Sequence, residues 1–167
     1  APVEFGRRVI APHLDRLLER HPELELNLRL SDALIDLPGE RVDVAVRLGS
    51  TLLSDDVVSV GLGEFTRWLV ASPAYLAGHP AIDEPQALLS HQCLRFDFGT
   101  GMPPWQFTAA DGVQEVAVRG RLQSNNADVL REAAVAGQGV ALLADWLVHD
   151  DVASGRLLRL LDHHVVS

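Results

Sequence analysis

The feature that most constrains the fold is a regular succession of helix-like and strand-like segments near the start of the chain. Apolar residues recur at helical spacing from Gly6 to Arg20, where Pro12 should kink the helix or mark its first turn. Leucines alternate with polar residues over 24–30, and valines alternate over 42–48, as in half-buried strands. This order favours a parallel or mixed sheet covered by helices, and therefore an α/β fold.

Similar elements continue beyond the polar stretch at 51–56. A short helix is expected to follow Ser31-Asp32. Further strands are expected at 57–62, 68–71, 94–98, 105–107, 115–122, 140–143 and 157–161, and further helices at 73–77, 84–89, 127–136 and 145–148. We expect a first lobe over 1–68, a second lobe over 69–162, and a strand that starts at 163–167 and returns to the first lobe. The abrupt start and stop suggest a fragment cut from a longer protein.

The stretch from Ser124 to Leu143 combines polar side chains, a helix and a buried strand. Asn125 or Asn126 can cap the helix, because the side-chain oxygen of asparagine accepts hydrogen bonds from free N–H groups. Gly137 is suited to the end of that helix. The run at 140–143 is apolar throughout, as in a strand that is covered on both faces.

The composition excludes several classes of protein. The net charge is -9 and all 14 basic residues are arginine, so the chain by itself is a poor candidate to hold a nucleic-acid backbone. Cys93 is the one cysteine, which excludes an intrachain disulfide and fits a cytoplasmic location. No apolar run is long enough to span a membrane.

No motif indicates an enzyme, a metal or a cofactor. His91 and Cys93 would share one face of a strand, but a cysteine between apolar neighbours is typical of a core. The pair His163-His164 has no third ligand at metal spacing. The turn at 137–139 lacks the third glycine of a dinucleotide site. We therefore expect no catalytic residue, no metal and no cofactor.

Several segments, in order, resemble the effector-binding domain of LysR-type transcriptional regulators. They are 2–6, 21–24, 43–49, 70–76, 91–96, 105–107, 120–126 and 136–143, where the segment at 70–76 reads Val-Ala-Ser-Pro-Ala-Tyr-Leu. The resemblance implies two Rossmann-like lobes joined by a hinge, as in type 2 periplasmic-binding proteins, with a small effector bound in the cleft between them. It also implies a winged helix-turn-helix domain upstream and a homodimer or homotetramer, in which the helix at 7–20 lies near the second lobe of another subunit.

Candidate ligand-binding residues lie where strands end and helices begin, because helix N-termini and loop amides point into such a cleft. They are Val3, Glu4, Phe5, Ser31, Asp32, Arg47, Leu48, Gly49, Ser124, Asn125 and Asn126. Free N–H groups together with Arg47 favour an anion, so a carboxylate is one candidate effector.

Each candidate also has a purely structural interpretation. The serine, aspartate and asparagines are ordinary helix caps. Arg47 can pair with Asp43 or Glu40 at the surface. Glu4 is expected to face solvent; in the cleft it would repel a carboxylate and favour an amine or a hydroxylated ligand. The alternative function is a periplasmic solute receptor that feeds a transporter, and a third class is an enzyme that uses the cleft.

Overall fold

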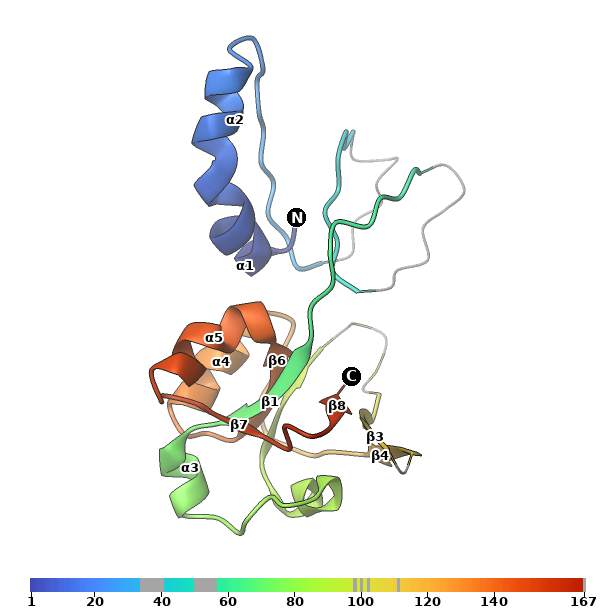
Figure 1. The fold of residues 1–167 in the computed structure, drawn as a ribbon, viewed down its shortest axis with the longest axis vertical. Coiled ribbons are helices and arrows are strands. Elements are labelled where there is room, and N and C mark those ends of the chain that lie inside the picture. The colour runs from blue at the N-terminus through green and yellow to red at the C-terminus, as the bar shows by residue number, and fades with distance from the viewer. Residues whose placement is uncertain are drawn as a thin grey trace. The chain divides into compact units, whose positions relative to one another are not determined.

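The computed structural model describes residues 1–33, 41–49, 57–97, 99, 101, 103–110 and 112–166 (Figure 1). The chain divides into two compact units, Ala1–Leu62 and Gly63–Ser167, called unit 1 and unit 2 below. The lobe boundaries expected from the sequence remain a prediction. The helix expected after Ser31-Asp32 and the polar stretch at 51–56 fall almost entirely outside the described residues.

Unit 1 begins with a continuous helical stretch that changes its winding. It consists of α1 (Val3–Phe5), a π-helical turn (Gly6–Ile10), a 3₁₀ turn (Ala11–His13) and α2 (Leu14–Arg20). Pro12 lies in the 3₁₀ turn, and a proline has no N–H to donate to the preceding turn. The irregularity predicted at Pro12 is therefore confirmed, while the helix starts earlier than expected.

The strands predicted over 24–30, 42–48 and 57–62 are wrong: the described residues there form no strand. Two backbone hydrogen bonds link 29–31 to the start of the chain. The Ala1 amino group donates to the Arg29 carbonyl (3.0 Å), and the Ser31 N–H donates to the Ala1 carbonyl (2.9 Å). Alternation makes a segment suitable for a strand, but a strand forms only where a neighbour continues the ladder.

Unit 2 is built on a mixed eight-stranded sheet in the order β4-β3-β8-β1-β6-β2-β5, with β7 also pairing with β1. Its strands are β1 (Arg67–Ala71), β2 (Cys93–Phe96), β3 (Trp105–Ala109), β4 (Gly112–Val116), β5 (Gln123–Ser124), β6 (Val140–Ala144), β7 (Leu158–Leu160) and β8 (Val165–Val166). β1 is antiparallel to β6, whereas β2 is parallel to both β5 and β6.

The strand predicted at 115–122 ends early, at Val116. Beyond it, the carbonyls of Arg119 and Leu122 accept hydrogen bonds from the N–H groups of Cys93 (2.9 Å) and Arg95 (3.1 Å). Arg119 and Leu122 are three positions apart, whereas their partners Cys93 and Arg95 on β2 are two positions apart. The pairing therefore contains a bulge. Gly120 lies at this bulge, where a Cβ atom would collide with the backbone of Cys93.

The helices of unit 2 are α3 (Pro73–Ala77), a 3₁₀ turn (Pro85–Ser90), α4 (Ala127–Val135) and α5 (Asp145–Ala153). Ser72 caps α3 by accepting a hydrogen bond from the Tyr75 N–H (3.3 Å). α5 is longer than predicted, and Asp145 is its first residue rather than the residue before it.

Two hydrophobic clusters fill unit 2. Leu69 and Ala71 belong to one cluster and Val70 to the other, because successive side chains of a strand point to opposite faces. Val140 and Ala141 divide in the same way, which confirms that β6 is covered on both faces. In Figure 1, α4 and α5 lie together beside the sheet, and the second cluster contains Leu130 from α4 and Leu147 from α5.

Candidate functional site

The first group of candidate residues surrounds the start of α1. Val3, Glu4 and Phe5 form its first turn. The Val3 N–H donates to Oδ1 of Asp32 (2.9 Å), 29 residues along the chain. Asp32 therefore caps α1. Its carboxylate already occupies the first amide of this helix, and the negative charge it brings opposes an anion at that place.

Glu4 is buried, with 6% of its surface exposed, so the expectation that it faces solvent is wrong. Its carboxylate accepts hydrogen bonds from Nη1 of Arg7 (2.9 Å) and Nε of Arg8 (3.2 Å), one helical turn away. The two guanidinium groups compensate its charge, which explains how a carboxylate is accommodated there.

Ser31 and Arg47 lie close to the first residues of the chain. The Ser31 N–H is bonded to the Ala1 carbonyl, and its Oγ accepts a hydrogen bond from the Ala33 N–H (3.2 Å). Burial lowers the pKa of the Ala1 amino group, and the nearby charge of Arg47 lowers it further. Gly49, next to the half-buried Leu48, has a φ of 89°, in the left-handed region that glycine tolerates.

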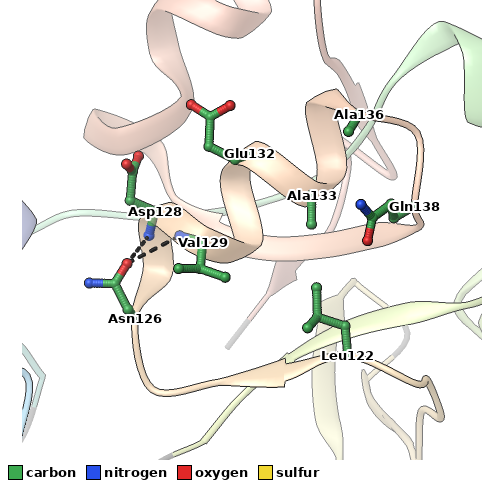
Figure 2. A pocket seen from close by; sticks show the side chains of 8 residues that line it. All are labelled: Leu122, Asn126, Asp128, Val129, Glu132, Ala133, Ala136 and Gln138. Carbon is green, nitrogen blue, oxygen red and sulfur yellow. Dashed lines mark hydrogen bonds between the residues drawn. The ribbon is translucent and has the colours of Figure 1, made fainter.

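The second group lies in unit 2, where β5 leads into α4 (Figure 2). Oδ1 of Asn126 accepts hydrogen bonds from the N–H groups of Asp128 and Val129, each 3.1 Å long. Oγ of Ser124 accepts one from the Asn126 N–H (3.0 Å). Of the two asparagines, Asn126 is thus the helix cap, while Asn125 lies between them with its side chain exposed.

A shallow depression of about 470 Å³ adjoins this group within unit 2. Its lining combines apolar side chains with amides and carboxylates: Leu122, Asn126, Asp128, Val129, Glu132, Ala133, Ala136 and Gln138 (Figure 2). Asn126 is the one predicted site residue in this lining, because Ser124 and Asn125 do not contribute to it.

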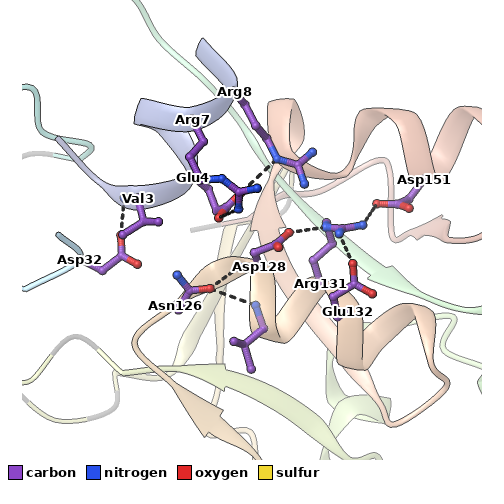
Figure 3. Close-up of polar contacts among 11 residues, drawn as sticks. Val3, Glu4, Arg7, Arg8, Asp32, Asn126, Asp128, Arg131, Glu132 and Asp151 are labelled. Atoms are coloured by element: carbon purple, nitrogen blue, oxygen red, sulfur yellow. Dashed lines mark hydrogen bonds and ion pairs between the residues drawn. The ribbon is translucent and has the colours of Figure 1, made fainter. Parts of the chain in front are cut away.

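Arg131 organises a buried ionic network that the sequence analysis did not identify (Figure 3). Its Nε donates to Asp128 (2.6 Å), its Nη1 donates to Asp151 on α5 (2.9 Å), and its Nη2 contacts Glu132. Burial lowers the pKa of Arg131, but the hydrogen bonds and charges of Asp128 and Asp151 outweigh burial and raise it. The network ties the start of α4 to α5.

The thiol and the histidines give no support to catalysis. Burial raises the pKa of Cys93 to about 12, against a smaller lowering by Arg95, so the nucleophilic thiolate is suppressed. Within the described part of the chain, no three histidine, cysteine, aspartate or glutamate side chains gather as a metal site. No helix among the described residues is long and apolar enough to cross a membrane.

Unit 2 is therefore an α/β unit in which polar side chains cap the starts of α3 and α4. The family model of the LysR substrate binding domain matches residues 1–167. The chain therefore belongs to this family, which confirms both the resemblance and the fold class expected from the sequence.

The relatives are named as regulators of transcription. The chain is 34% identical over 163 residues to the HTH-type transcriptional regulator DmlR of Escherichia coli K12, covering 96% of this chain and 52% of that protein. It is 31% identical over 166 residues to the HTH-type transcriptional activator TtdR of the same strain, covering 98% and 53%. The chain thus spans about half the length of these relatives. The alternative of a periplasmic solute receptor is not supported.

Solved structures show the same fold. The LysR-type regulator CrgA of Neisseria meningitidis superposes with a TM-score of 0.84 at 29% identity, covering 98% of this chain and 55% of that chain. The full-length virulence activator AphB of Vibrio cholerae gives a TM-score of 0.82 at 28% identity, covering 97% and 55%.

Proposed function

We propose that this chain is the effector-sensing domain of a DNA-binding transcriptional regulator and has no catalytic role. The observation that carries the proposal is the match of the LysR substrate binding domain to the whole chain, combined with relatives about twice as long that are named as HTH-type regulators. An N-terminal winged helix-turn-helix in the longer protein binds DNA. Because a regulator that binds DNA must reach the DNA, the protein is expected in the cytoplasm. The one cysteine of this chain, Cys93, is buried and free, which fits a reducing compartment.

The candidate effector contacts are 3–5, 31–32 and 47–49 in unit 1 and 124–126 in unit 2, each group considered by itself. Asp32 occupies the Val3 N–H, and Asn126 occupies two N–H groups of α4. Recognition of a carboxylate therefore relies on Arg47 and Asn125 more than on helix ends. Asp32 adds a negative charge near the Ala1 amino group, which Arg47 also approaches, so the effector carries a hydroxyl or amine as well as any carboxylate.

Effector binding controls transcription by favouring one of two conformations, for which its affinities must differ. The protein acts as a homodimer or homotetramer, so that a change in one domain alters the spacing of DNA-binding domains. α2 is a candidate contact between subunits, because it exposes Leu17 and Leu18 to solvent.

A thermal-shift screen of small carboxylates, hydroxy acids and amino acids tests the proposal, since a ligand that binds only the folded state raises the melting temperature. A compound present at about 100 times its Kd should stabilise the domain by about 2.7 kcal/mol. We expect this stabilisation to be lost in the double variant Asn125→Ala/Arg47→Ala.

The matched control is Asn27→Ala/Arg16→Ala, which removes the same residue types from exposed positions outside the site. It should keep the full ligand response. If the site variant binds as tightly as the wild-type chain, the proposed site is wrong; if the response is lost equally in both variants, the effect is one of general stability.

A further inference from the structure

A second depression, of about 260 Å³, lies within unit 2 and is lined by Trp68, Asp145, Trp146 and His149. The sheet register explains why these residues meet. Arg67 on β1 is paired with Ala144 at the end of β6, so Trp68 lies beside the point where α5 begins. Asp145 and Trp146 open α5, and His149 follows one turn later on the same side of the helix.

The two tryptophans are half-buried and pack against the second hydrophobic cluster. Each ring is therefore held by the core on one side while part of its surface remains open to solvent. The His149 ring is 6.3 Å from the Trp68 ring, centroid to centroid, at an angle of 42°. The lining thus offers three aromatic rings, two of which are held in place by the core.

One cation already uses this kind of surface. The guanidinium carbon of Arg159 lies over the Trp68 ring, 4.9 Å from its centroid. Arg159 does not line the depression. The contact shows that this indole accepts a positive charge in the folded protein, as expected from the negative electrostatic potential of an aromatic face.

Asp145 supplies a negative charge, and both of its carboxylate oxygens already accept hydrogen bonds. Oδ2 accepts from the N–H (3.1 Å) and the hydroxyl (2.8 Å) of Thr66, and Oδ1 accepts from the Trp146 N–H (2.7 Å). Burial raises the pKa of this carboxyl, but these hydrogen bonds outweigh burial and lower it, so the group remains ionised.

We propose that the depression lined by Trp68, Asp145, Trp146 and His149 binds a small quaternary ammonium ion. Aromatic faces beside a carboxylate attract a cation. Both carboxylate oxygens of Asp145 already accept hydrogen bonds. A quaternary ammonium ion has no N–H group and needs no acceptor, whereas a primary amine would leave N–H groups without hydrogen bonds. The carboxylate repels anions. This site is independent of the proposed effector site, because none of its residues belongs to that set.

The test compares choline with 3,3-dimethylbutan-1-ol, its uncharged carbon analogue, by following the three tryptophan indole N–H signals in NMR spectra of the 167-residue chain. At about pH 8, where imidazole is ordinarily neutral, choline should shift the Trp68 and Trp146 signals saturably, with a Kd of about 1–10 mM. The Trp105 signal, from the buried core on β3, should not move. The uncharged analogue should bind at least about fivefold more weakly.

Variants identify the charge that matters. Asp145→Asn should weaken choline binding about fivefold. Asp150→Asn, which makes the same change in net charge from an exposed position on α5, should bind like the wild-type chain. If Asp145→Asn does not fold, the pair Trp146→Phe and Trp146→Leu replaces it: phenylalanine should retain more affinity than leucine, because only the aromatic ring attracts a cation.

Several outcomes would overturn the proposal: no shift with choline, shifts equal for choline and its analogue, or shifts equal to those produced by the same concentration of sodium chloride. Glycine betaine should bind more weakly than choline, since Asp145 repels its carboxylate. Binding to phosphatidylcholine vesicles without binding to free choline would identify a lipid surface as the ligand and would contradict the proposal of a small cation.

Discussion

Among the described residues, alternating apolar sequences are buried in unit 2 but partly exposed in unit 1. In unit 2, Trp105 and Phe107 alternate with Gln106 in a strand that has neighbours on both sides, and both aromatic residues are buried. In unit 1, Leu24 and Leu26 alternate just as regularly, yet 42% and 44% of the surface of these residues is exposed. Alternation therefore indicates which segments suit a sheet, while the neighbouring strand decides whether burial follows.

The polar contacts differ in the same sense. Arg131 is 8% exposed and joins two helices of unit 2, whereas Arg7 in unit 1 pairs with Glu4 one turn away, and 63% of its side chain is exposed. All three tryptophans lie in unit 2, so their fluorescence reports its unfolding, whereas far-UV circular dichroism reports the loss of helix in both units.

The largest effect is expected for Arg131→Met. The variant leaves Asp151, which is 2% exposed, with only the exposed Arg156 as an ionic partner. Removing one member of a buried ion pair costs about 3–5 kcal/mol, and urea unfolding followed by tryptophan fluorescence measures it. Arg7→Met in unit 1 removes an arginine whose side chain is 63% exposed and leaves the buried Glu4 paired with Arg8, so it should cost less, about 1 kcal/mol. Equal costs would break the comparison.

Leucine truncation sharpens the comparison of the two cores. Leu130→Ala removes a fully buried side chain of α4 and should destabilise unit 2 by about 2–5 kcal/mol. Leu26→Ala removes a side chain that is already 44% exposed and should cost less than about 1 kcal/mol. Denaturant titrations followed by both signals measure the two values. A cost at Leu26 as large as that at Leu130 would show that this leucine is buried.

The smallest effect concerns pH. Burial lowers the pKa of His91, and the nearby His79 lowers it further. The folded state therefore binds this proton less readily than the unfolded state, so stability is complete above the ordinary histidine value of about 6.5 and falls as the pH drops below it. The loss for one proton is at most about 1.4 kcal/mol per pH unit. His91→Asn should flatten the dependence of unfolding free energy on pH, and an unchanged slope would contradict this assignment.

Local patterns predicted much of unit 2. The spacing around Ala127, the asparagines before it and Gly137 after it locate α4 to within a residue, because caps and turns depend on neighbours in sequence. Contacts between distant residues could not be predicted in this way. Asp32 caps a helix that begins 29 residues earlier, and Arg131 finds Asp151 20 residues away. Neither pairing leaves a periodic signal.

The candidate site shows the same division. The residue types at 124–126 indicated a helix cap, and the structure assigns that role to Asn126. Glu4 was expected at the surface because most glutamates are exposed, but Arg7 and Arg8 lie within reach on the next turn and permit its burial. The spacing of these residues, i to i+3 and i+4, was a usable signal for an ion pair on one helix.

The most direct test of the account is amide hydrogen exchange with and without a compound selected by the thermal-shift screen. If the candidate residues bind the effector, exchange should slow at 3–5, 31–32 and 47–49 in unit 1 or at 124–126 in unit 2, with no change around Trp105 in the core. Protection that is absent from both groups, or spread evenly over the chain, would contradict the claim that this domain senses its effector through these residues.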